Sequence, residues 1–116
     1  MIILYKNKKA RKQFSPEFKS KWRYSPSVSD GIEETENYIR AARNLRDIAN
    51  YSPFHLERLN GNRKKTPWSI RIVGSKYRIL LFPCSDDGII ITEGDILSQA
   101  DAIMVIMVVE VSNHYE

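Results

Sequence analysis

A predicted β-hairpin over residues 68–82 constrains the fold of this chain more than any other stretch. Residues 68–73 (WSIRIV) alternate large apolar side chains with smaller or charged ones. Residues 76–82 (KYRILLF) are rich in aromatic and β-branched types, a composition typical of strands. Gly74 and Ser75 between them suit a two-residue type II′ turn, in which glycine supplies the positive φ. Such a turn fixes the register of the two strands.

In this register Arg71 lies opposite Arg78, on one face of the hairpin. The apolar side chains share the other face: Ile70, Ile72, Tyr77 and Ile79. Like charges in that relation destabilise a sheet, so an anion between the two guanidinium groups would relieve the repulsion. Arginine suits phosphate because its fork is planar and permanently charged. Two interpretations stay open: the pair binds phosphate, or each arginine points into water or pairs with its own carboxylate.

Length and composition predict one small cytoplasmic domain that spans residues 1–116. The formal net charge is +4, which favours a polyanionic partner such as nucleic acid. A single cysteine excludes an internal disulfide, and with two histidines the chain offers too few ligands for a structural zinc site. We therefore expect no metal and no cofactor. The longest apolar run, residues 102–109, is far shorter than the ~20 residues that cross a bilayer, so we expect no membrane partner.

The N-terminal quarter combines a short apolar strand, residues 2–5, with a cluster of positive charge. Ser15 and Pro16 predict the start of a short helix, since serine caps helices and proline suits their first position. The cluster has three open interpretations: an RNA-backbone patch, a docking face for an acidic partner, or a solvated basic helix. Its members are Lys6, Lys8, Lys9, Arg11, Lys12, Lys19, Lys21 and Arg23.

The rest of the chain predicts an α+β fold, in which an N-terminal strand and two helices pack on an antiparallel sheet. Residues 25–31 (SPSVSDG) have the composition of a loop, and a longer helix with apolar residues at helical spacing follows up to residue 49. Residues 54–59 (FHLERL) alternate like a strand. Residues 88–100 suggest a strand and then a loop. Residues 103–111 (IMVIMVVEV) are apolar on both faces, which predicts a central strand.

A second group of cations precedes the hairpin. Arg63, Lys64 and Lys65 fall in a predicted turn over residues 60–66. Beside the two hairpin arginines they would extend an anion site into a track, as a chain of phosphates requires.

Three segments together resemble a known family. The stretch LERLNGNRKKTPWSIRIVGSKYRILLF, with the closing VVEVSNHYE, is similar to the HigB branch of the RelE-like toxins, the killer proteins of plasmid-maintenance systems. That family carries an L-x-G-x-R segment leading to W/F-S, a YRI/L strand and a closing VEI-x-D-Y-H. The similarity covers about residues 43–116, and it rests on the order and spacing of the three segments.

The resemblance implies the RelE-like microbial ribonuclease-type fold and ribosome-dependent, metal-independent cleavage of mRNA, which inhibits translation. It also implies neutralisation by a helix-turn-helix antitoxin similar to HigA, through which alone the toxin would contact operator DNA. In the implied active site Arg71 is a basic strand residue, Arg78 binds phosphate and His114 lies in the closing motif. RNA-binding residues on this interpretation are Arg63, Lys64, Lys65, Lys76 and Tyr115.

Two positions depart from the family pattern. Some RelE-like enzymes carry lysine two residues before the position of Arg71, and this chain has Ser69. The closing motif reads SNHYE where an acid often precedes the aromatic residue and the histidine, so an orienting partner for His114 is missing from the pattern.

Metal-free RNA cleavage needs a base, an acid and cations for the charge on the phosphate oxygens. The arginines supply only the cations, whereas His114 has a pKa range suited to proton transfer. The second proton-transfer group stays open among Lys64, Lys65, Glu110 and Tyr115. Two other functions also stay open: a non-catalytic basic module that binds RNA or ribosomes, and a protein-interaction module that uses the basic N-terminal region.

Overall fold

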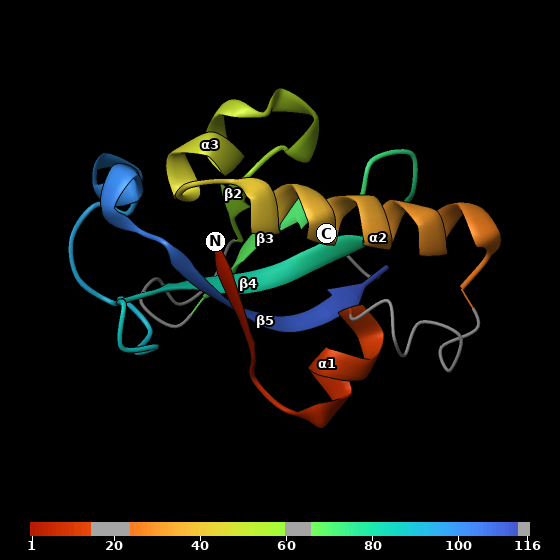
Figure 1. Cartoon of the computed structure of the whole chain (residues 1–116), viewed down its shortest axis with the longest axis horizontal. Helices are drawn as coiled ribbons and strands as arrows, with labels where there is room; N and C mark the ends of the chain where they lie inside the picture. Colours follow the sequence, from red (N-terminus) through yellow and green to blue (C-terminus); the bar gives the residue numbers. More distant parts are fainter. Residues whose placement is uncertain (15–23, 60–65, 114–116) are drawn as a thin grey trace.

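The computed structural model of the protein describes residues 1–14, 24–59 and 66–113. It confirms the predicted α+β class: helices pack against a five-stranded, mostly antiparallel sheet (Figure 1). The elements in chain order are β1 (Ile2–Tyr5), α1 (Lys8–Phe14), α2 (Pro26–Ala41), α3 (Leu45–Asn50), the 3-10 turn η2 (Ser52–Phe54), β2 (Glu57–Arg58), β3 (Trp68–Arg71), β4 (Arg78–Cys84), the 3-10 turn η4 (Leu97–Ala102) and β5 (Val105–Ser112).

The sheet has the strand order β1-β5-β4-β3-β2. β5 lies between β1 and β4, which confirms the prediction of a central strand from its apolar run. β1 pairs with β5 in parallel, and the other neighbours are antiparallel. The N-terminal strand therefore joins the sheet beside the C-terminal one.

The register of the β3–β4 hairpin is as predicted, with Ile70 opposite Ile79 and Arg71 opposite Arg78. The turn differs from the predicted two-residue type II′ turn. The N–H of Ser75 donates to the carbonyl of Ile72 (3.1 Å), so Gly74, with φ of 82°, is the third residue of the turn. A positive φ at this position favours glycine, as the predicted type II′ turn also did. The register of the two strands is the same in both turns.

α2 crosses one face of the sheet (Figure 1) and supplies Ile32 and Ile39 to a core that also contains Ile70, Ile72 and Ile79. The crossing is close at Gly31, where an added Cβ would lie 2.8 Å from the Cγ2 of Ile72. Ile72 is fully buried, and its branched side chain has little freedom to move away. Glycine in mid-helix is therefore required by packing.

We expect Gly31→Ala to lower the free energy of unfolding by up to about 2 kcal/mol. The steric cost of overpacking, typically about 1–3 kcal/mol, exceeds the gain of about 1 kcal/mol in helix propensity. Urea denaturation measures the change. The control is Asn37→Ala, an exposed position on the same helix, which should be neutral or slightly stabilising. Equal stabilisation by both substitutions would contradict the close contact.

The prediction of a loop over residues 25–31 is wrong, because α2 begins at Pro26. The hydroxyl of Ser25 accepts from the N–H of Val28 (3.4 Å), and Pro26 takes the first helical position. A cap and a proline at the first turn are sufficient to start a helix through Asp30 and Gly31.

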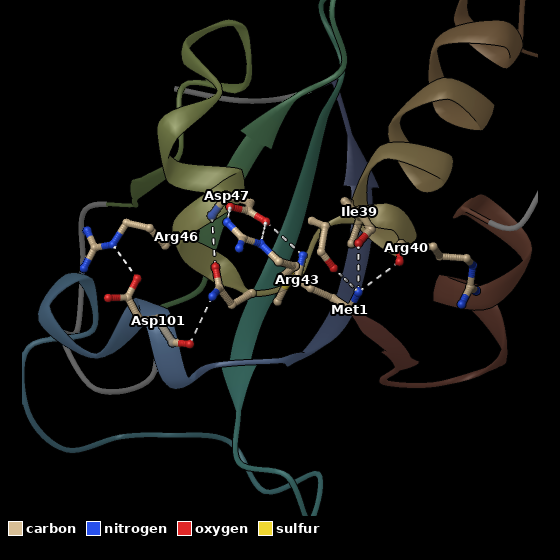
Figure 2. Close-up of polar contacts among 9 residues, drawn as sticks. Met1, Ile39, Arg40, Arg43, Arg46, Asp47 and Asp101 are labelled. Atoms are coloured by element: carbon tan, nitrogen blue, oxygen red, sulfur yellow. Dashed lines mark hydrogen bonds and ion pairs between the residues drawn. The ribbon is translucent and has the colours of Figure 1, made fainter.

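The prediction of one helix up to residue 49 is also wrong, since the chain breaks between α2 and α3. The side chain of Asn44 caps α3, and the N–H of Leu45 donates to the carbonyl of Ile103 (2.8 Å). Figure 2 shows the polar contacts around this break, including the ion pair between Arg46 and Asp101 of η4 (3.1 Å). The α-amino group of Met1 donates to three carbonyls at the end of α2, where a positive charge complements the helix dipole.

α1 lies along β5 beyond the end of β1 and buries Ala10, Gln13 and Phe14. There the side-chain amide of Gln13 forms the hydrogen bonds that a neighbouring strand would form with β5. Its Nε2 donates to the carbonyl of Val111 (3.4 Å), and its Oε1 accepts from the N–H of the same residue (3.2 Å). The helix thereby satisfies the edge of β5.

Two further predictions are only partly correct. Of the predicted strand over residues 54–59 only β2 forms, because η2 and a left-handed His55 (φ 47°) precede it. Residues 88–100 form a single bridge at Ile90 and the first part of η4 instead of a strand. The predicted helix start at Ser15 and Pro16 lies outside the described residues, and α1 occupies the basic segment before it.

Candidate functional site

The face of the sheet opposite α2 carries the polar side chains of the candidate site. Arg71 and Ser69 on β3 alternate with the buried Ile70. The pairing of strands carries this face across the sheet: Ser69 lies opposite Glu57 on β2, and Arg78 lies opposite Ser112 on β5. The site thus spans four adjacent strands.

Arg78 is the buried cation of this face, with only 5% of its surface exposed. Its Nε donates to the hydroxyl of Ser69 (2.9 Å), and its Nη2 donates to the main-chain carbonyl of His55 (3.0 Å). The same Nη2 lies 3.4 Å from Oε1 of Glu57. Among the described residues, Ser69, His55 and Glu57, from three different segments, therefore fix the guanidinium group.

The sequence left open whether the two arginines bind phosphate or whether each points into water or pairs with its own carboxylate. Arg78 pairs with the carboxylate of Glu57, as in the second interpretation. The carboxylate of Glu57 thus offsets the repulsion between Arg71 and Arg78, and no bound phosphate is required to explain why the two arginines lie opposite each other. Arg78 is therefore buried and paired, whereas Arg71 is exposed.

Arg71 and Lys76 are the exposed cations. Within the described residues neither forms an ion pair. Both line an open concavity of about 460 Å³, which we call the arginine groove; its lining residues are Arg71, Gly74, Ser75, Lys76, Tyr77 and Arg78. Because Arg78 is buried, it contributes positive potential to the floor, whereas Arg71 and Lys76 are accessible for direct contact with an anion.

The end of β5 lies beside the groove. Ser112 pairs with Arg78, two residues before His114 in the sequence. Glu110 pairs with Leu80 and is exposed on the same face. A bulge between Leu80 and Leu81 shifts the register of this last part of β5 and sets which of its residues face the arginines.

Five predicted site residues lie outside the described residues: Arg63, Lys64, Lys65, His114 and Tyr115. The described part of the site therefore consists of the arginine groove and its surroundings. Of the predicted residues it brings together Arg71, Lys76 and Arg78.

Two other ionisable groups near the sheet are unsuited to proton transfer at neutral pH. Burial, reinforced by Tyr77, raises the pKa of Tyr24 to about 12. Its hydroxyl donates to the carbonyl of Gln13 (3.2 Å), and its ring packs edge-on against Tyr77. Burial also raises the pKa of the Cys84 thiol, which disfavours the reactive thiolate.

Sequence reasoning missed the three groups that hold Arg78. Ser69 was noted only as a departure from lysine, although its hydroxyl orients the guanidinium. Glu57 lies on a strand of two residues, and His55 acts through its main chain. The alternation over residues 54–59 was the one available signal, because it placed His55 and Glu57 on one face of a predicted strand.

Comparison with protein-family models, with curated proteins and with solved structures finds no match to this chain. The fold and the groove together define a small α+β domain with a cationic concavity on the open side of its sheet. Among the described residues, no helix has the length and apolarity of a membrane span. No group of side chains in the same residues has the composition of a metal site.

Proposed function

We propose that this chain is the toxin of a type II toxin-antitoxin system, a metal-independent endoribonuclease that cleaves mRNA on the ribosome and inhibits translation in the cytoplasm. The observation that carries the proposal is the arginine groove. Two exposed cations and a third fixed beneath them form a positive surface, and positive charge is what stabilisation of a developing phosphate charge requires. The resemblance of the sequence to RelE-like toxins supplies the reaction.

In this reaction the RNA 2′-oxygen attacks the adjacent phosphorus and the bond to the 5′-oxygen breaks. A base takes the proton of the 2′-hydroxyl, and an acid gives one to the departing 5′-oxygen, so the products carry a cyclic phosphate and a 5′-hydroxyl. Arg71 and Lys76 contact the phosphate, and Arg78 adds its field from below. His114 is one proton-transfer group, and Glu110, exposed on the same face, is a candidate for the other.

The test is cleavage in a translating extract. Purified protein added to the extract should generate discrete mRNA fragments with 5′-hydroxyl ends, mapped by primer extension, and only while ribosomes translate. His114→Gln should remove the fragments and leave the circular dichroism spectrum unchanged. If folded protein at a tenfold excess over ribosomes gave no fragments in a translating extract, the proposal would be refuted.

The ion pair between Arg78 and Glu57 favours one alternative, a non-catalytic basic module that binds RNA or ribosomes. A neutralised Arg78 leaves fewer cations to stabilise a transition state, although Arg71 and Lys76 still attract RNA. This alternative predicts RNA binding that weakens steeply with salt and gives no fragments.

The proposed partner is an antitoxin with a helix-turn-helix domain, encoded beside this chain. Co-expression with the neighbouring reading frame should restore growth to cells that produce the toxin. A neighbouring frame that encodes such a domain and still fails to rescue growth would argue against this partner.

A further inference from the structure

A second concave surface runs along α2, on the side where α3 and η2 approach it. Two hollows, of about 420 and 190 Å³, meet at Tyr38 and Tyr51, which line both. One continues to Ala42 and the other to Gly31, so the surface follows about three turns of α2, or about 16 Å. We call it the tyrosine groove.

The groove exposes apolar groups on a rigid base. Tyr38 is 38% exposed, and Val73 at the far end is 49% exposed. The ring of Tyr38 packs against Tyr51 (4.5 Å between centroids) and edge-on against the buried Phe54 (5.1 Å). Exposed aromatic side chains that are already fixed in position are characteristic of binding surfaces, because little rotamer entropy is lost on binding.

The charged residues that line the groove are acidic, in a chain with a net charge of +4: Glu34 lines one hollow and Asp47 the other, and among the described residues neither hollow is lined by a lysine or an arginine. Glu34 lines the groove, is exposed and forms no ion pair within the described residues. Asp47, at the other end, is already bound by Arg43 (Figure 2), whose Nε and Nη2 each donate to it at 3.3 Å. Glu34 is therefore the carboxylate available to a ligand.

We propose that the tyrosine groove docks a basic segment of a partner protein. A lysine or arginine of the segment pairs with Glu34, and its apolar side chains cover Tyr38 and Val73. The carboxylates of α2 repel RNA phosphates, which makes nucleic acid a poor occupant. The groove is long enough for about five extended residues or about ten helical ones.

This surface is separate from the arginine groove, and its role does not depend on RNA cleavage. The two grooves have no lining residue in common. Failure of the docking test would therefore leave the proposed ribonuclease activity unaffected.

The experiment uses labelled peptides about twelve residues long, each with three leucines and either four arginines or four glutamates. NMR titration of the ¹⁵N-labelled protein should show that the arginine peptide shifts the amide signals of Glu34, Tyr38 and Val73. Glu34→Lys should weaken binding, measured by fluorescence anisotropy, by at least about fivefold. Tyr38→Ala should weaken it by about 30-fold, and Tyr38→Phe, which keeps the ring, should not.

The matched control is Asp86→Lys, which makes the same change of two charge units in an exposed turn outside the groove and should leave peptide binding unchanged. Because Glu34 is exposed, its substitution tests the proposal even if Tyr38→Ala fails to fold. Equal affinity for the glutamate peptide, or shifts confined to the arginine groove, would overturn the proposal. Self-association through this surface, detected by sedimentation, would overturn it as well.

Discussion

Replacing Arg71 with alanine is expected to reduce mRNA cleavage by at least about 10²-fold, because a preorganised charge donor at a reacting phosphate typically contributes that much. The side chain is exposed, and within the described residues it forms no ion pair. Its removal should therefore leave the fold intact, so that the loss reports on the reaction alone. Quantitative primer extension in a translating extract measures the rate, and urea denaturation measures the stability.

The control for Arg71→Ala is Arg58→Ala, which removes the same charge from β2. Arg58 lies over the ring of Trp68 (5.1 Å to the centroid), and Trp68 belongs to the core between sheet and helices. It is therefore remote from the open face, and its loss should leave cleavage within about twofold of the wild type. Equal losses in both variants would mean that net charge, and not the arginine groove, governs the activity.

The register of the candidate site was predictable from the sequence. Side chains alternate with a period of two along a strand, so the buried Ile70 and Ile79 determine the face that Arg71 and Arg78 take. The position of the turn does not change this result. A local pattern was therefore sufficient to place the two arginines on one face.

The environment of Arg78 was not predictable in the same way. Its partners come from β2, β3 and the residue after η2, and β2 has only two residues, too few to show a period. The start of α2 was missed for a different reason. The serine and proline at residues 25–26 form the same cap that predicted a helix at residues 15–16, but the composition around them resembles a loop.

These two errors have one physical origin. Composition averages over a window, whereas a helix cap and a buried arginine each depend on a single hydrogen-bonding geometry. Where many side chains contribute to one outcome, as in the apolar alternation of β3 and the continuous apolar run of β5, the sequence predicts that outcome. Where the outcome depends on a single group, such as the hydroxyl of Ser69 or the main-chain carbonyl of His55, only the structure identifies that group.

Replacing Arg78 with alanine is expected to destabilise the protein by about 3 kcal/mol, in contrast to Arg71→Ala. The substitution leaves the fully buried hydroxyl of Ser69 without its donor, and an unsatisfied buried group costs about 1–3 kcal/mol. It also removes the buried stem of Arg78 and the donor to His55. A shift of the urea midpoint at unchanged slope would measure this loss.

Glu57→Gln separates the ion pair from the other contacts of Arg78. The side chain of Glu57 is 47% exposed, so loss of its charge should cost less than about 1 kcal/mol. The same substitution unmasks the positive charge of Arg78 beneath the groove and should strengthen RNA binding at low salt. An Arg78→Ala variant as stable as the wild type would show that the contacts of Arg78 with Ser69, His55 and Glu57 do not stabilise the fold. A cost at Glu57 equal to that at Arg78 would assign the stability to the ion pair instead of the hydrogen bonds to Ser69 and His55.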